Sequence, residues 1–256
     1  MLKTIFQKLR DIISLDGGQC KVCFDGRLVS FEKRLNINGN IDDMYICSNC
    51  FVIMNYTRQA QDLTLQKTGL TEFYRYTESE IVELRPTIES HKGIIANILD
   101  LMPAYHRQTF LEIGSGRGTL LIAASEIGFK SVVGVDLSLS VFEETKKHVK
   151  VGDNITMYHE ISEVHQRADC IVMWHTLEHI FEPAAFFMEL KKVQNRGCLL
   201  YFQVPQYHQP YICDTHHYFY NEPSIRALMK KNGYKTLRVE YDTVNQFLTV
   251  IAKAVN

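Results

Sequence analysis

Seven cysteines occur in the chain, and four of them form two closely spaced pairs. Two residues separate Cys20 from Cys23, two separate Cys47 from Cys50, and 23 residues lie between the pairs. Two such pairs allow four thiolates to converge on one tetrahedral zinc ion, each pair forming a tight turn. We therefore expect a structural zinc site, the alternatives being four unrelated buried thiols or two redox pairs. Four protein ligands would leave zinc no open position for catalysis.

The stretch between the two pairs is slightly longer than the roughly 15 to 20 residues usual between such pairs. It contains Asn38-Gly39, a turn signal, and the strand-like run Met44–Ile46. A hairpin would accommodate the extra length. The sequence thus predicts a small zinc-ribbon-like module at the N-terminal end of the chain.

A glycine-rich segment has the order strand, tight turn, helix. The apolar run Phe110–Ile113 is typical of a buried parallel strand, and Gly114, Gly116 and Gly118 follow at alternate positions. Glycine lets the backbone turn at positive φ and lets a ligand approach without a Cβ in the way. The segment is either a cofactor-binding loop or a glycine turn with no ligand.

The identity of a bound cofactor depends on two details of this loop. A dinucleotide loop reads G-x-G-x-x-G and binds a pyrophosphate, but here the third glycine comes one residue early and Thr119 takes its place. Glu112 would repel a phosphate and suit a cationic or amine-bearing ligand. Asp136, 18 residues past Gly118, lies near the interval at which such folds bind ribose hydroxyls, although helix capping is a second possible role.

Two histidine-containing segments offer groups that could transfer a proton. His175 and His179 belong to H-T-L-E-H, which directly follows the apolar strand Ala168–Trp174, at the edge where open α/β sheets bind ligands. Their spacing would also fit two metal ligands on one helical turn, but the order differs from the H-E-x-x-H of zinc proteases. His216 lies in a histidine- and tyrosine-rich segment, residues 206–221. Each histidine could instead be structural, held by hydrogen bonds.

The elements that must position these residues alternate between strand and helix from Thr109 onward, the pattern of a doubly wound α/β sheet. The expected strands are 109–113, 131–136, 154–158, 168–174, 197–204 and a final hairpin, 235–244 with 247–255. The expected helices are 81–102, 120–127, 139–150, 183–194 and 222–233. A further strand is expected at 51–54.

We expect three parts: an N-terminal helix and zinc module (1–56), a helical linker (57–104) and the α/β domain (105–256). Apolar residues at helical spacing in residues 2–15 predict a helix that packs on its own domain or on a twin subunit in a homodimer. A membrane-surface helix is the alternative. The polar and aromatic residues 57–80 would either fold over the cofactor or form a plain surface connection.

The composition does not indicate a polyanionic partner or a membrane span. The net charge is −1 and 46% of residues are hydrophobic, so nothing in the totals indicates a polyanion partner. The zinc-module segment 20–50 balances its charges, with Lys21, Arg27, Lys33 and Arg34 opposed by Asp25, Glu32, Asp42 and Asp43. No apolar run approaches the roughly 18 residues of a membrane span, and charged residues interrupt the N-terminus, unlike a signal peptide. We expect a cytoplasmic protein with reduced cysteines.

The segments L-E-I-G-S-G-R-G, V-V-G-V-D-L-S and W-H-T-L-E-H-I-F-E-P resemble, in this order, the motifs of class I S-adenosylmethionine (SAM) methyltransferases. The resemblance runs along the whole C-terminal domain and implies a Rossmann-like seven-stranded sheet. It places Glu160 or its neighbour at the adenine amine. The residues it implies for binding SAM are Glu112, Gly114, Ser115, Gly116, Gly118, Asp136, Leu137, Glu160 and Trp174.

Together with the cysteine pairs, the chain resembles bacterial zinc-binding methyltransferases of sugar, polysaccharide and natural-product pathways. In the deoxysugar C-methyltransferases among them, a segment like D-E-H-x-x-Y-F supplies the base, and Asp214–Phe219 matches it here. Thr215 replaces the glutamate and Cys213 stands where tyrosine is frequent, so O-methylation of a small, sugar-like acceptor is slightly favoured over C-methylation. The resemblance makes His216 the base, and His175 would orient the acceptor.

Two other functions remain open. Some ribosomal RNA methyltransferases carry a cysteine zinc module, but the module here has no basic excess, and no N-P-P-[FY] follows the fourth strand. A non-catalytic SAM-fold protein whose zinc module binds a partner is the other alternative.

Overall fold

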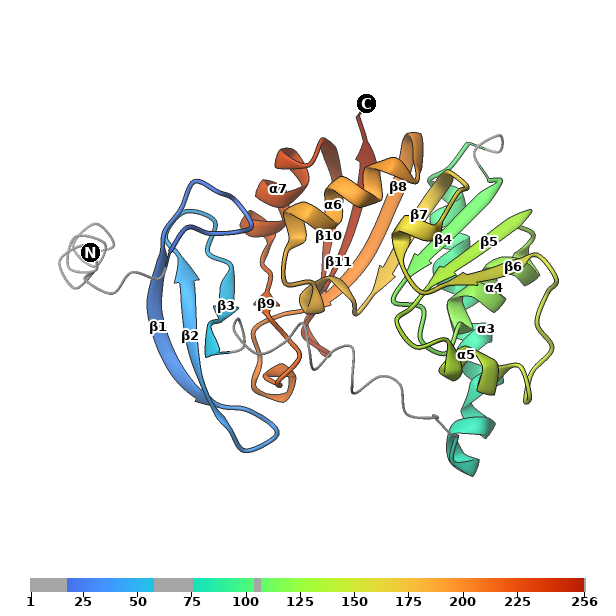
Figure 1. Ribbon diagram of the computed structural model, residues 1–256, viewed down its shortest axis with the longest axis horizontal. Coiled ribbons are helices and arrows are strands. Elements are labelled where there is room, and N and C mark those ends of the chain that lie inside the picture. The colour runs from blue at the N-terminus through green and yellow to red at the C-terminus, as the bar shows by residue number, and fades with distance from the viewer. Residues whose placement is uncertain (1–17, 58–75, 104–106, 256) are drawn as a thin grey trace.

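A computed structural model describes residues 18–57, 76–103 and 107–255 (Figure 1). The helix expected at 2–15 and most of the segment expected at 57–80 lie outside these residues. The described part forms two sheets, with helices on both faces of the larger one.

The larger sheet has seven strands in the order β10-β11-β8-β7-β4-β5-β6. The five strands from β4 to β8 are parallel, while β11 is antiparallel to both β8 and β10. This confirms the predicted Rossmann-like sheet and its terminal hairpin. The strands are β4 (Thr109–Ile113), β5 (Ser131–Val135), β6 (Ile155–Tyr158), β7 (Ala168–Trp174), β8 (Gln194–Pro205), β10 (Tyr234–Asp242) and β11 (Phe247–Ala254).

Two hydrophobic cores fill the space between this sheet and its helices. Because successive strand residues point to opposite faces, Cys170 and Val172 of β7 enter the core with α3 and α4, whereas Ile171 and Met173 enter the core with α6 and α7. Central strands buried on both faces explain the continuous apolar runs in the sequence. The helices are α3 (Glu78–Asp100), α4 (Thr119–Ile127), α5 (Leu139–Thr145), α6 (Pro183–Lys192) and α7 (Glu222–Lys231).

Among the five described helices, α3 and α5 differ most from the predicted bounds, while the ends of the other three agree to within two residues. α3 begins at Glu78 because Thr77 and Glu80 form a capping box, so Pro86 lies inside the helix and not near its start. α5 ends at Thr145 and not at residue 150, because the backbone N–H groups of Lys147 and His148 bond three residues back and tighten the chain into turns.

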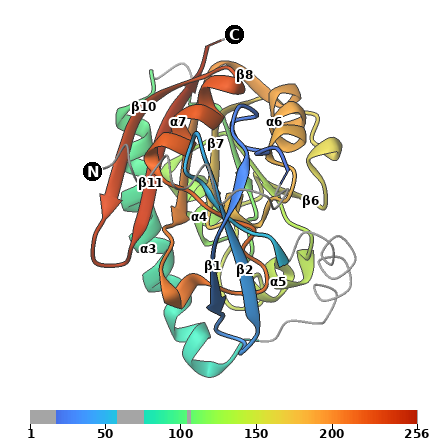
Figure 2. The same ribbon diagram turned by 90° about the vertical axis from the view of Figure 1, so that its left-hand side faces the viewer.

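The smaller sheet joins the cysteine module to the C-terminal half of the chain. Its order is β1 (Leu28–Leu35), β2 (Ile41–Cys47), β3 (Ile53–Asn55) and β9 (Tyr218–Phe219), all antiparallel neighbours. Figure 2 shows this sheet in front of the larger one. The four cysteines also belong to the same core as α6 and α7, so the module packs directly on the α/β domain.

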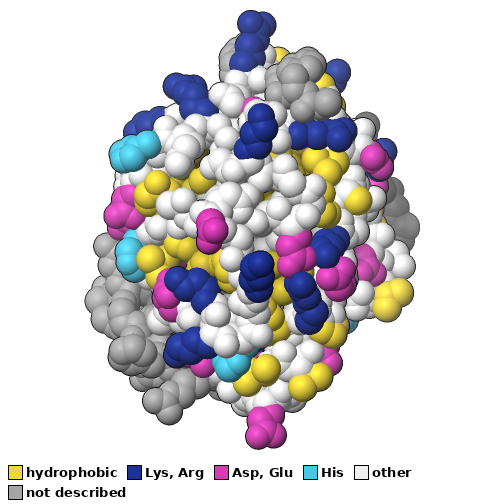
Figure 3. All heavy atoms as spheres, turned by 90° about the vertical axis from the view of Figure 1, so that its right-hand side faces the viewer, with side chains coloured by type: hydrophobic (Ala, Val, Ile, Leu, Met, Phe, Trp, Pro, Cys, Tyr) yellow, Lys and Arg dark blue, Asp and Glu magenta, His cyan; other side chains and the backbone are white. Residues whose placement is uncertain are grey.

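Acidic and basic side chains are interspersed on the face shown in Figure 3. In the described part of the chain, Lys92 of α3 pairs with Glu126 of α4, and Glu144 of α5 pairs with Lys147 in the turn that follows it. No helix in the described ranges is both long and apolar enough to cross a membrane.

Candidate functional site

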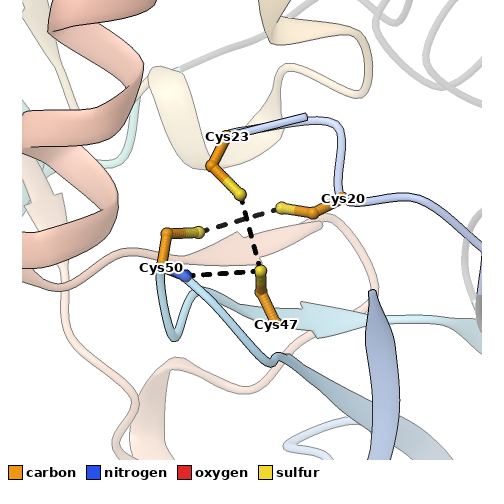
Figure 4. A group of neighbouring side chains, drawn as sticks. All are labelled: Cys20, Cys23, Cys47 and Cys50. Carbon is orange, nitrogen blue, oxygen red and sulfur yellow. Dashed lines mark hydrogen bonds between the residues drawn. The ribbon is translucent and has the colours of Figure 1, made fainter. Parts of the chain in front are cut away.

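The four cysteines converge as the sequence predicts (Figure 4). The sulfurs of Cys20 and Cys50 are 3.8 Å apart, and those of Cys23 and Cys47 are 3.6 Å apart. All four sulfurs lie within 4.8 Å of one another. With Zn–S bonds of about 2.3 Å, the edge of a ZnS₄ tetrahedron is about 3.8 Å. The donor set and its spacing therefore fit zinc.

The backbone around the cluster is shaped for sulfur ligands. The N–H groups of Asn49 and Cys50 each donate to Cys47 Sγ at 3.4 Å, and a Cβ at Gly26 would lie only 2.3 Å from the same sulfur. These contacts favour the thiolate, which is the form that binds a metal.

The glycine loop after β4 turns at positive φ at each of its three glycines. A Cβ at Gly114 would lie 2.3 Å from Thr176 Oγ1, and a Cβ at Gly118 would lie 2.3 Å from the Phe142 ring. Gly116, with φ of 47°, has no heavy atom within 4 Å of its Cβ position. Packing thus requires glycine at Gly114 and Gly118. Gly116 leaves open space above the backbone, which suits the close approach of a cofactor.

Two buried polar groups beside this loop have unused hydrogen-bonding capacity. Ser115 Oγ and Glu112 Oε2 are buried and have no hydrogen-bond partner among the described residues. Burial raises the pKa of Glu112 well above its usual range, and the nearby Asp136 carboxylate adds to this effect. Buried polar groups are normally hydrogen-bonded, so these two atoms fit a polar ligand in the loop. This fit agrees with SAM, whose amino and carboxylate groups can both form hydrogen bonds.

Asp136 has two structural contacts of its own. Its carboxylate accepts from the N–H of Gly116 at 2.7 Å and from the N–H of Ser138 at 2.9 Å. The Asp136 carboxylate therefore links the glycine loop to the start of α5. This link is similar to the helix-capping role that the sequence also allowed. Each carboxylate oxygen can accept a second hydrogen bond, so ribose binding stays a prediction.

The remaining residues expected to bind SAM, Leu137, Glu160 and Trp174, lie at or just after the ends of β5, β6 and β7. Leu137 is 47% exposed, and its carbonyl contacts the His159 ring at 3.4 Å, which brings the ends of β5 and β6 together. Glu160 is exposed next to His159. Trp174, at the end of β7, stacks on Tyr201 with ring planes 9° apart. Their contacts with SAM stay predictions.

His175 lies where β7 meets the glycine loop. Its backbone is left-handed, with φ of 52°, an uncommon conformation for a residue other than glycine, and its N–H donates to Gln203 O at 3.0 Å. The next residue, Thr176, donates from its hydroxyl to Ile113 O at 3.0 Å. His175 is thus fixed one residue from the contact of Thr176 with the end of β4, where the glycine loop begins.

Glu178 was not among the site residues expected from the sequence, but it lies beside them in the structure. The H-T-L-E-H segment forms a 3-10 turn, Leu177–His179, which sends the Glu178 side chain inward, where it is 0% exposed. Oxygen and nitrogen atoms of Glu178, His179 and His216 lie within 4.8 Å of one another, and His175 Nδ1 is 3.7 Å from Glu178 Oε1. The sequence signal that could have identified Glu178 is its place between His175 and His179 in H-T-L-E-H.

The two histidines beside Glu178 are held by backbone carbonyls. His179 Nδ1 contacts Thr215 O at 2.9 Å, and the His216 ring bonds to the backbone of Tyr211. Burial lowers the pKa of His216, and the Glu178 charge opposes that effect. The structure therefore brings together His175, His179 and His216, which the sequence placed in two distant segments.

The segment that carries His216 is covered by the β1–β2 hairpin. Asn36 and Asn38 donate to Asp214 at 2.6 and 2.8 Å, and Tyr207 donates to Glu32 at 2.6 Å. Ile37 N–H bonds to Ile212 O at 2.9 Å. The cysteine module thus braces the histidine segment as well as packing on α6 and α7.

A family model for a methyltransferase domain matches residues 74–239, more than half of the chain. No curated protein matches the sequence. Among solved structures, magnesium protoporphyrin IX methyltransferase of Synechocystis PCC 6803 with bound SAH has a TM-score of 0.53 at 15% identity, over 74% of this chain and 96% of that one.

Two further structures show the same fold. A SAM-dependent methyltransferase of Aquifex aeolicus has a TM-score of 0.53 at 20% identity, covering 71% of this chain and 100% of that one. A chain in the complex between the Haloferax volcanii Trm112 methyltransferase activator and a methyltransferase has a TM-score of 0.56 at 13% identity, covering 68% and 94%. With the family match, the seven-stranded sheet and the glycine loop, the chain belongs to the methyltransferase-domain family and is a SAM-dependent methyltransferase.

Proposed function

We propose that the enzyme methylates a hydroxyl group of a small, sugar-like acceptor, such as a nucleotide-sugar or a surface-polysaccharide precursor. His216 is the general base and His175 orients the acceptor. The observation that carries this proposal is the gathering of His175, His179 and His216 around Glu178. His175 precedes Thr176, whose hydroxyl bonds to the end of β4, where the glycine loop begins.

SAM would be held by the loop that follows β4 and by the ends of β5 and β6. The buried Ser115 and Glu112 side chains would meet the polar methionine part, and Asp136 and Leu137 would meet the ribose and the adenine. Bound SAM supplies an electrophilic methyl group, which the acceptor oxygen takes up as it loses its proton.

The protein must remove the proton of the acceptor hydroxyl. A general base must reach the hydroxyl and must be unprotonated near neutral pH. His216 meets the second condition because burial lowers its pKa, and its buried Nδ1 has no hydrogen bond among the described residues. His175 is 34% exposed and packs edge-on against Phe247, with ring centroids 4.6 Å apart, so it can meet an acceptor and hold its orientation.

The surroundings of His216 support a polar, ring-shaped acceptor. Tyr207, His208 and Tyr211 lie on the segment before it, each partly or fully exposed. Aromatic faces and hydroxyl or imidazole groups suit the apolar faces and hydroxyl edges of a sugar ring.

We propose that zinc bound by Cys20, Cys23, Cys47 and Cys50 is structural. All four sulfurs are buried, and the module that they hold contacts the histidine segment through Asp214 and Tyr207. Zinc would act on turnover indirectly, by fixing the position of His216.

The test uses the purified full chain with SAM and a panel of nucleotide-sugars and free sugars, with products detected by a mass increase of one methyl group. We expect an O-methylated product, with turnover lost in His216→Ala and reduced in His175→Ala while SAM affinity is retained. Full activity in both variants would refute the assignment. Methylation of RNA alone, with steep salt dependence, would refute the acceptor class.

A further inference from the structure

One buried carboxylate lies at the centre of the histidines described above. The Glu178 side chain is 0% exposed, and neither of its oxygens has a hydrogen bond among the described residues. An ionised carboxylate removed from water is unfavourable unless a positive or donating group faces it. The surroundings of Glu178 should therefore contain a group that becomes positive.

The groups that face Glu178 are imidazoles. Ring nitrogens of His179 and His216 lie with a Glu178 oxygen inside 4.8 Å. Within the described ranges, its ion-pair contact is with His175 Nδ1, at 3.7 Å from Oε1. Among the described residues, further titratable groups of this region are His217, whose N–H donates to Glu178 O at 2.9 Å, and the buried Tyr220.

The imidazoles are oriented with one nitrogen toward a backbone carbonyl. His179 uses Nδ1 to contact Thr215 O, and the His216 ring bonds to the Tyr211 backbone. In a neutral imidazole that donates from one nitrogen, the other nitrogen carries a lone pair. For His216 the buried Nδ1, which has no hydrogen bond among the described residues, is therefore the nitrogen that can take a proton.

We propose that Glu178 is a positioning residue for methyl transfer, whose buried carboxylate stabilises the imidazolium of His216. The inference rests on the proposed function. The O–H bond of the acceptor breaks, its electron pair stays on oxygen, and the proton moves to His216. The Glu178–His216 pair changes from a net charge of −1 to 0 and returns to −1 when the proton leaves to solvent. No buried charge is left unbalanced after the transfer.

A divalent cation is the competing occupant, since two histidines and a carboxylate are also common metal ligands. A cation there would use the lone pair of His216 that proton transfer requires. His216 therefore cannot bind a cation and accept the acceptor's proton at the same time. The metal content of the purified protein distinguishes the two cases. We expect one zinc per chain, at the cysteines, in the wild type and in Glu178→Gln. Two metals in the wild type and one in the variant would overturn the proposal.

The direct test is an NMR titration of the histidine side chains without acceptor, with His216→Asn used to assign the resonance. Removing the Glu178 charge should lower the pKa of His216 by about one unit or more in Glu178→Gln. The control is Glu182→Gln, which removes a charge four residues on, where the side chain is 53% exposed and pairs with Lys21. An unchanged His216 pKa in Glu178→Gln would overturn the proposal.

The second test measures kcat and its dependence on pH in Glu178 variants. With an active acceptor, Glu178→Gln should lower kcat about 10-fold or more and shift the acid limb of the pH profile to lower pH, with SAM affinity unchanged. Glu178→Asp, which keeps the charge, should recover part of kcat. If kcat falls in Glu178→Gln but the acid limb of the pH profile does not move, Glu178 has only a structural role and the proposal is overturned. If no acceptor is methylated, the proposed function fails, while the NMR titration still tests Glu178.

Discussion

Asp214, two residues before His216, accepts a hydrogen bond from Asn36 at the tip of the cysteine-module hairpin, with 2.6 Å between Asn36 Nδ2 and Asp214 Oδ1. Asn36 also donates to the buried Asp42 at 3.0 Å, and Asp42 accepts from Asn55 at 2.8 Å. The N–H of Asn55 bonds to His217 O at 3.0 Å. The histidine segment is therefore held on both sides of His216 by the module.

Asp214→Ala tests this bracing. Removing the acceptor for Asn36 and Asn38 should release the segment, and displacement of a catalytic group by about 1 Å can cost up to about 100-fold in rate. We expect kcat to fall about 10-fold or more, with SAM affinity changed less than about 2-fold, in steady-state and calorimetric measurements. Asp153→Ala, on the exposed turn before β6, is the control. Equal kcat in both variants would contradict the bracing role.

Loss of one zinc ligand should destabilise the whole chain and not only the module. The cysteines share a core with α6 and α7, and metal binding is coupled to folding in such sites. We expect Cys47→Ser to lower Tm by roughly 10 °C or more and to lower the zinc content. Cys213→Ser is the matched control, since Cys213 is half-buried and lies outside the cluster. A Tm equal to that of the control would show that the module contributes little to stability.

Gly116→Ala should weaken cofactor binding more than it weakens folding. A side chain at φ of 47° costs about 1 kcal/mol or more, and its Cβ would point into the open space above the loop. We expect SAM affinity to fall about 10-fold or more by calorimetry. Gly93→Ala, on the exposed face of α3, should instead be neutral or stabilising by about 0.5 to 1 kcal/mol. Wild-type SAM affinity in Gly116→Ala would argue against the loop as the cradle.

Stability should decrease as the pH falls below about 6.5. Burial lowers the pKa of His217 to about 4 and also lowers those of His91, His179 and His216. Between the folded and unfolded pKa values the unfolded chain binds more protons, so stability is present above the unfolded pKa and is lost on acidification. For His217 the difference between an ordinary pKa of 6.5 and a pKa of about 4 corresponds to roughly 3 kcal/mol of stability.

The measurement is a series of thermal melts from pH 7 to pH 4. The wild-type Tm should fall steadily across this range. His217→Gln, which keeps a polar side chain but cannot titrate, should flatten the lower part of the curve. A curve with the same slope in both proteins would contradict the assignment of acid sensitivity to His217.

Local patterns were sufficient to predict the larger sheet, because its buried strands are mostly apolar runs, interrupted by few polar residues such as Glu112 and Asp169, and glycine, proline or polar residues end most of them. The cysteine cluster was predictable for a similar reason: both pairs have the spacing that a metal requires. The prediction was weaker for α3, where the capping box formed by Thr77 and Glu80 decided the start, and for α5, where turn-type bonds replaced helical ones.

The site was only partly predictable, since its critical contacts join segments far apart in sequence. Glu178 looks like one acid at a helix start until the 3-10 turn buries it. Strand β9 has two residues, too few for any periodicity, and it forms only because β3 offers an edge. The bracing of Asp214 by Asn36 spans a separation that no local pattern encodes.

The pairing of Ile53 with Phe219 and of Met54 with Tyr218 has a consequence for how the chain folds while it is being synthesised. During synthesis from the N-terminus, the cysteines can bind their metal early, but the open edge of β3 has to wait for the strand that covers it. An uncovered strand edge is a site for wrong pairing with other chains, and contacts this distant in sequence form slowly. Incomplete chains that end before β9 should therefore be the aggregation-prone species of this protein, even when their cysteine module is fully loaded.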